Sequence, residues 1–125
     1  MKVKSILLGV VFCLIIAAGA AAEGAFHFAL TKSTPVADSA VPSPDEVRLW
    51  FTQIPQENSV AVRIINPAGD LVDTSQPRLD QTDRKIVSVS LDRTLRTGGY
   101  TVSWRGIGDD GHVVRGEFGF TVSAQ

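Results

Sequence analysis

The sequence predicts an all-β domain, a β-sandwich or Greek-key barrel, over the part of the chain that follows its apolar N-terminal segment. Short segments that alternate apolar and polar residues recur there about every ten residues, and turn-forming residues separate them. No long segment in this part has the 3.6-residue apolar period of an amphipathic helix, and no internal repeat is present. These features together favour one small domain built from short strands.

Six strands are predicted in order, over residues 47–52, 60–64, 71–74, 86–91, 100–105 and 113–122. In the first of them, Val47, Leu49 and Phe51 alternate with Arg48 and Trp50, which is typical of a strand with one buried face. Trp50 is out of phase with the apolar positions. We therefore expect its side chain to face solvent or a partner.

Turn-forming residues mark the ends of these strands. Asn66 to Asp70 reads Asn-Pro-Ala-Gly-Asp, a loop passes through Pro77 and Asp80, and Leu95 to Gly99 turns the chain into the fifth strand. On that strand Tyr100 alternates with other apolar residues, including Trp104. We expect both aromatic side chains to pack in the core.

Residues 1–22 are predicted to be a cleaved export signal, which leaves a domain over residues 23–125. Lys2 and Lys4 precede an apolar run from Ile6 to Ala18, and three alanines at 20–22 satisfy the small-residue cleavage rule. The apolar run is short for a membrane span, which needs about 20 residues. The alternative is an uncleaved N-terminal anchor.

The composition of the predicted domain excludes several classes of function. Removing Lys2 and Lys4 leaves 10 basic against 13 acidic residues, a net charge of −3, without the basic patch that nucleic-acid binding requires. Cys13 and Met1, the only cysteine and methionine, both fall in the predicted signal, so the domain has no sulfur ligand for a soft metal. No nucleophile–histidine motif or carboxylate pair suggests an enzyme.

Five segments together carry a resemblance to a known family: His27 to Pro35, Pro44 to Phe51, Gly98 to Arg105, Asp110 to Gly116 and Phe118 to Phe120. In this order and spacing they resemble the CopC family of periplasmic copper-resistance proteins. The most specific part is the Tyr-x-Val-x-Trp-Arg strand followed by Asp-Gly-His and Gly-x-Phe-x-Phe. The resemblance implies a seven-stranded Greek-key β-barrel, related to immunoglobulin domains, that binds copper in the periplasm.

The resemblance also implies one Cu(II) site, with His27, Asp110 and His112 as ligands. Imidazole and carboxylate suit Cu(II), and in an extended strand residues 110 and 112 would point to the same face. The methionine-rich Cu(I) site of many family members is absent. Each residue also has a structural interpretation: Asp110 as part of a Gly-Asp-Asp-Gly turn, His112 as a surface histidine and His27 as an exposed terminal residue.

The family's tight site has histidine as the first mature residue, where the α-amine chelates with the imidazole. Cleavage after Ala22 would instead leave Glu23 first and His27 fifth. Cleavage after Phe26 would restore the family pattern but contradicts the small-residue rule. Cleavage after Gly24 would place His27 third, where an amine, two amides and an imidazole form a square-planar chelate. From a Glu23 start we expect a weaker site, completed by water.

Two functions follow from these residues. The first is a monomeric periplasmic Cu(II) carrier or store that contributes to copper resistance and homeostasis, with an inner-membrane copper transporter as its partner. The second is an immunoglobulin-like module that contacts an envelope component and has a weak or degenerate copper site. Stoichiometric Cu(II) binding separates the two.

Overall fold

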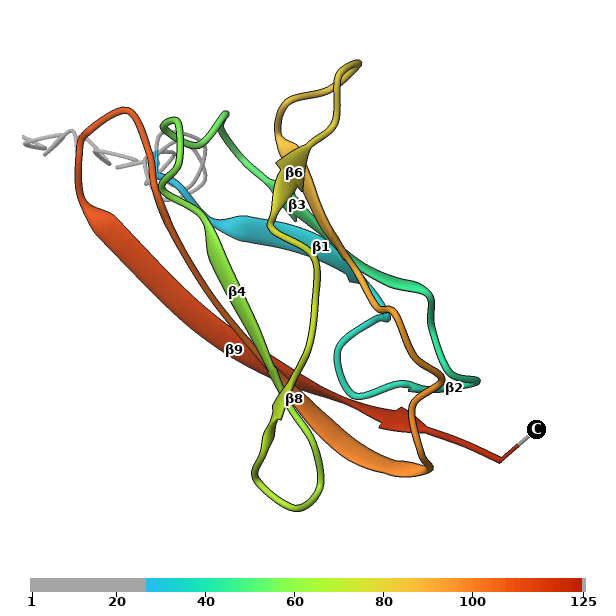
Figure 1. Cartoon of the computed structure of the whole chain (residues 1–125). Helices are drawn as coiled ribbons and strands as arrows, with labels where there is room; N and C mark the ends of the chain where they lie inside the picture. Colours follow the sequence, from blue (N-terminus) through green and yellow to red (C-terminus); the bar gives the residue numbers. More distant parts are fainter. Residues whose placement is uncertain (1–26, 125) are drawn as a thin grey trace, which may run out of the picture.

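The computed structural model describes residues 27–124, which form two β-sheets packed face to face (Figure 1). Within this range nine strands follow one another: β1 (Leu30–Thr34), β2 (Ala40–Val41), β3 (Glu46–Phe51), β4 (Ala61–Ile65), β5 (Leu71–Val72), β6 (Arg78–Leu79), β7 (Ile86–Ser90), β8 (Gly98–Ile107) and β9 (Val113–Val122). The predicted all-β class is confirmed. Three of these strands have only two residues each, so six of the nine are longer, compared with the seven strands that the resemblance implied.

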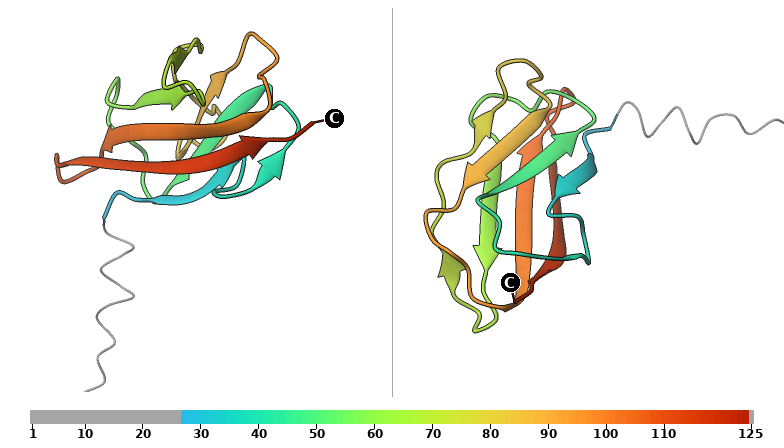
Figure 2. Two further views of the ribbon diagram at one scale, coloured as in Figure 1. Left: turned by 90° about the horizontal axis from the view of Figure 1, so that it is seen from below. Right: turned by 90° about the vertical axis from the view of Figure 1, so that its right-hand side faces the viewer.

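Each sheet combines strands from distant parts of the chain. The four-stranded sheet has the order β1-β3-β7-β6, and the five-stranded sheet has the order β2-β9-β8-β4-β5. All pairings are antiparallel except that of β2 with β9. The β8–β9 hairpin is the longest element, with ten paired positions on each strand, and Figure 2 shows its two strands side by side. Its connection, residues 108–112, lies at one end of the sandwich.

One hydrophobic core fills the space between the sheets. Val47, Leu49 and Phe51 on β3 are almost fully buried, as their alternation predicted. The core also contains Tyr100 and Trp104 of β8, which are 4% and 8% exposed, so both expectations for these side chains are confirmed. Burying one face of each sheet in this way is what makes the alternating sequence pattern stable as a sandwich.

Trp50 lies on the outer face of β3, as its phase predicted. It is half-buried, and Lys32 Nζ stands 4.5 Å from its ring centroid, in cation–π geometry. Strand β1 was not among the strands predicted from alternation. Its pairing with β3 is irregular between Leu30 and Lys32, and such a bulge breaks the two-residue period.

The predicted signal over residues 1–22 lies outside the described residues and stays a prediction. Within residues 27–124 no helix is long and apolar enough to cross a membrane.

Candidate metal site

The β8–β9 connection is a tight turn that ends β8 and places Asp110 at its tip. The N–H of Gly111 donates to the carbonyl of Gly108 at 3.1 Å, which closes the turn. Gly111 has a φ of 80°, a left-handed conformation that favours glycine. The turn interpretation of Asp110 is therefore correct, but it does not exclude a role in metal binding.

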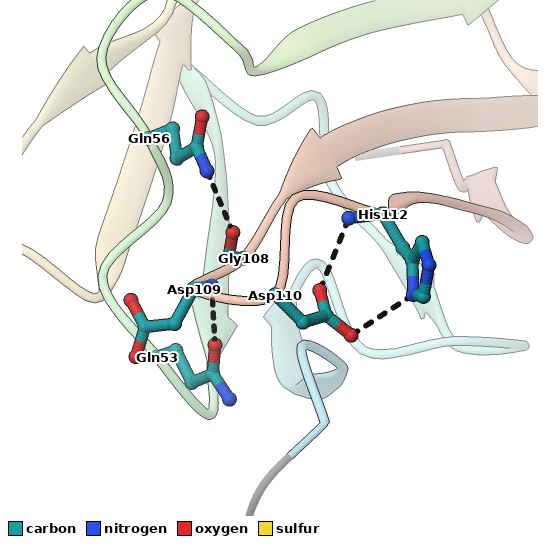
Figure 3. A network of polar contacts seen from close by, with 6 residues as sticks. All are labelled: Gln53, Gln56, Gly108, Asp109, Asp110 and His112. Carbon is teal, nitrogen blue, oxygen red and sulfur yellow. Dashed lines mark hydrogen bonds and ion pairs between the residues drawn. The ribbon is translucent and has the colours of Figure 1, made fainter.

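The side chains of Asp110 and His112 meet beside this turn (Figure 3). The backbone N–H of His112 donates to Asp110 Oδ1 at 3.1 Å, and His112 Nδ1 lies 3.1 Å from Asp110 Oδ2. We expected the two residues to share one face of an extended strand, and this is wrong, because β9 begins only at Val113. The turn itself brings the side chains together, because the Asp110 carboxylate accepts a hydrogen bond from the backbone N–H of His112, two residues further along the chain.

Asp110 is held in its ionised form. The hydrogen bond from the His112 N–H is the largest cause and lowers the pKa of Asp110. Desolvation, the second cause, opposes it, and the charge and side-chain hydrogen bond of His112, followed by the charge of His27, lower the pKa further. The His112 side chain is 83% exposed and that of Asp110 is 43% exposed. An ionised carboxylate and an accessible imidazole are therefore available to a metal ion.

Two glutamines from the loop between β3 and β4 hold the turn in place. Gln53 Oε1 accepts a hydrogen bond from the Asp109 N–H at 3.0 Å, and Gln56 Nε2 donates to the Gly108 carbonyl at 3.0 Å. Figure 3 shows the Asp109 carboxylate on the side of Gln53, away from His112. Sequence reasoning missed both glutamines, because no motif marks a contact between residues more than 50 positions apart.

The segment that carries His27 lies against the same turn. Thr52 Oγ1 donates to the His27 carbonyl at 2.5 Å and accepts from the Ala29 N–H at 3.0 Å, so residues 27–29 are fixed beside the end of β3. Phe28, between them, packs directly on Gly108. His27 itself is exposed. Its charge is the smallest of the causes that lower the pKa of Asp110.

The structure therefore brings together two of the three predicted ligands and places the third on an adjacent segment. Among residues 27–124 no group of three or more histidine, cysteine, aspartate or glutamate side chains is gathered closely enough to hold a metal ion. The His27 side chain would have to lie closer to Asp110 and His112 to complete such a group.

The spacing of Asp110 and His112 fits two neighbouring ligands of one metal ion. With bonds of about 2.0–2.2 Å to imidazole and carboxylate, two donors at a right angle lie about 3 Å apart. The 3.1 Å between His112 Nδ1 and Asp110 Oδ2 is close to this value. A metal ion could replace the proton between these two atoms, or bind His112 through Nε2 while Asp110 continues to orient the ring through Nδ1.

Comparison with known proteins finds a matching family and several relatives that are named for copper. The CopC domain matches residues 30–123. Copper resistance protein C of Xanthomonas campestris pv. juglandis is 29% identical over 114 residues, which cover 86% of this chain and 90% of that protein. Copper transport protein CutJ of Bacillus subtilis is 29% identical over 97 residues, which cover 77% of this chain and only 18% of CutJ.

Solved structures agree in fold. The crystal structure of CopC from Methylosinus trichosporium OB3b matches with a TM-score of 0.70 and 28% identity, covering 78% of this chain and 94% of that one. PcoC, a methionine-rich copper resistance protein from Escherichia coli, matches with a TM-score of 0.69 and 26% identity, covering 78% and 99%. The match of the family over most of the chain, with the same fold, shows that the protein belongs to the CopC domain family.

Proposed function

We propose that this protein is a periplasmic Cu(II)-binding protein that carries or stores copper and so contributes to copper resistance. The observation that carries the proposal is the Asp110–His112 pair, an ionised carboxylate and an imidazole 3.1 Å apart at an accessible turn. Nitrogen and oxygen donors of this kind suit Cu(II). The copper-resistance names of relatives such as that from Xanthomonas support the same conclusion.

His27 is the proposed third ligand, with water completing the site. Thr52 holds the His27 backbone, and the next residue, Phe28, packs on Gly108 of the turn, so the imidazole belongs to a segment that lies against the turn. Residues before His27 lie outside the described range, and the contribution of the α-amine depends on where the export signal is cleaved. A start at Glu23 gives a site without the amine, and therefore with weaker binding than a start at His27.

The proposal is tested by titrating Cu(II) into the exported protein after its N-terminus has been sequenced. We expect one equivalent to bind, with a tetragonal EPR signal and a d–d absorption band. Asp110→Ala and His112→Ala should each weaken binding by about tenfold or more, since each removes one ligand or its orienting partner. Asp109→Ala is the matched control, because that carboxylate points away from His112 (Figure 3). Unchanged affinity in both ligand variants would exclude this site.

The second candidate is an envelope interaction module with a degenerate copper site. It is favoured by one observation, that no three donor side chains are gathered within residues 27–124. Absence of stoichiometric Cu(II) binding in the same titration would support it.

For the first candidate, the partner that receives copper is proposed to be a membrane copper transporter, and the matching segment in Copper transport protein CutJ supports that pairing.

A further inference from the structure

Three arginines gather on the outer face of the five-stranded sheet, away from the Asp110–His112 turn. Arg63, Arg105 and Arg115 line a hollow of about 720 Å³, together with Ser103 and Glu117. Burial alternates along β8, so Ser103 and Arg105 face outward while their neighbours on that strand face the core. The hollow therefore lies outside the sandwich, and the three arginines come from the neighbouring strands β4, β8 and β9.

The strand register opposes two of these charges directly. Arg105 pairs with Arg115 across β8 and β9, and like charges at directly opposed positions destabilise a sheet. On its other side Arg105 faces Ala61, which offers no compensating charge. The sheet thus contains an unfavourable arginine pair at positions where a neutral residue would make the protein more stable. Such a cost in stability is expected if the two arginines bind an anion.

The hollow offers little internal neutralisation. Arg63 pairs with Ser103, and Ser103 pairs on its other side with Glu117, the only carboxylate that lines the hollow. Within residues 27–124 none of the three guanidinium groups forms an ion pair or a hydrogen bond. Three cations against one anion leave a local charge of about +2, with guanidinium groups free to form bidentate contacts.

The charge of the whole domain determines what kind of anion suits this hollow. Residues 27–124 contain 10 basic and 12 acidic residues, because Lys2, Lys4 and Glu23 lie outside the range, so their net charge is −2. An extended anionic surface such as a membrane would be repelled by the domain as a whole. A small, discrete anion that enters the hollow would contact mainly the arginines, and a volume of this size suits a small molecule.

We propose that this hollow is a binding site for a small organic or inorganic anion that carries two or more carboxylate or phosphate groups. Adjacent strands are about 4.8 Å apart, and Arg63 is offset by two residues along the register from Arg105 and Arg115. Arg63 and Arg115 are therefore anchored about 12 Å from each other, with Arg105 on the strand between them. A ligand with two separated charged groups can therefore contact two or three guanidinium groups at once. The Ser103 hydroxyl adds a neutral hydrogen-bonding group between them.

The site is tested by NMR titration of copper-free, ¹⁵N-labelled protein in a low-salt buffer without carboxylates or phosphate. The probes are citrate and pyrophosphate, with acetate at equal ionic strength as the monovalent comparison. We expect saturable shifts at the amides of residues 63, 103, 105, 115 and 117 for at least one of the first two probes. The probe that binds more tightly identifies the carboxylate or phosphate class, and equal binding indicates a site that recognises charge alone.

Variants separate a specific site from a general effect of charge. Arg105→Gln and Arg115→Gln should each weaken binding by about tenfold or more, because each removes charge-assisted hydrogen bonds. Arg84→Gln makes the same change of charge outside the hollow and should leave binding unchanged. No saturable shift with either probe, or equal losses in all three variants, would overturn the proposal. Because copper is absent, neither result bears on the Cu(II) site.

Discussion

The backbone of Gly108 lies directly against the side chain of Phe28, and this contact joins the two segments that carry the proposed copper ligands. A Cβ atom at residue 108 would lie 2.6 Å from Phe28 Cβ and 2.7 Å from Gln53 Oε1. Phe28 is itself 3% exposed and stacks on Phe51, with the ring centroids 4.6 Å apart. Residue 108 must therefore be glycine for the segment of His27 to lie beside the turn.

Gly108→Ala should destabilise the protein by about 1–3 kcal/mol, the usual cost of forcing an extra group into a packed site. It should also weaken Cu(II) binding, because Phe28 and the adjoining His27 would have to move. Chemical denaturation and copper titration measure the two effects. Gly99→Ala is the control, since a Cβ there meets nothing within 4 Å. Equal stability in both variants would show that the Phe28 contact is not restrictive.

Gln56→Ala should loosen the turn without removing any proposed ligand. Its side chain donates to the Gly108 carbonyl, and the loss of that bond should cost about 1 kcal/mol of unfolding free energy. We expect Cu(II) affinity to fall while the stoichiometry remains one. Gln81→Ala, a change to an exposed glutamine, serves as the control in the same titration. A variant with wild-type affinity would mean that the turn keeps its shape without Gln56.

Thr52→Val tests whether the anchored position of His27 matters. The substitution keeps the shape of the side chain but removes the donor to the His27 carbonyl and the acceptor for the Ala29 N–H, at a cost of about 1–2 kcal/mol. If His27 is a ligand, the folded variant should bind Cu(II) more weakly than the wild type. This loss of affinity would be separate from the loss of unfolding free energy. Thr101→Val, on the exposed side of β8, provides the comparison. Unchanged copper affinity would show that the contact with Thr52 does not position a ligand.

The sequence was sufficient for those features that depend on local pattern. Val47, Leu49 and Phe51 are buried because one face of β3 packs on the core. Side chains alternate between the two faces of a strand, so apolar residues recur at every second position of this segment. The Asp110–His112 pair could be found because both residues lie within one turn. Sequence reasoning named two residues whose side chains do meet, but it assumed the wrong geometry, since the positive φ at Gly111 ends the extended conformation.

Features that depend on distant segments could not be found in this way. Gln56 and Gly108 are 52 positions apart, and only the packing of two loops makes them neighbours. The arginine hollow is similar: Arg63, Arg105 and Arg115 are isolated charges in the sequence and become a cluster only through strand order and register. The position of His27 beside the turn likewise follows from Phe28 packing on Gly108.

The Asp110 carboxyl should titrate below the ordinary aspartate pKa of about 3.9. A lowered pKa in the folded state means that the group stabilises the fold above the unfolded value and that this contribution is lost as pH falls from about 4 through the folded pKa. His112→Ala removes the ring but keeps the backbone N–H, the largest cause, so much of the lowering should remain. Side-chain ¹³C titration measures both values, and an ordinary pKa for wild-type Asp110 would contradict the hydrogen bond.

Arg115→Thr should stabilise the protein, although it removes a residue proposed to bind anions. Replacing one member of the directly opposed Arg105–Arg115 pair relieves repulsion of about 0.2–1 kcal/mol and places a β-branched residue in the strand. Thermal unfolding at low salt should show the gain, and it should shrink as salt screens the charges. Arg63→Thr, whose cross-strand neighbour is Ser103, should gain less. If Arg115→Thr instead lost more stability than Arg63→Thr, favourable contacts would be holding the arginine pair in place. The repulsion between Arg105 and Arg115 could then no longer be used as an argument for an anion-binding site.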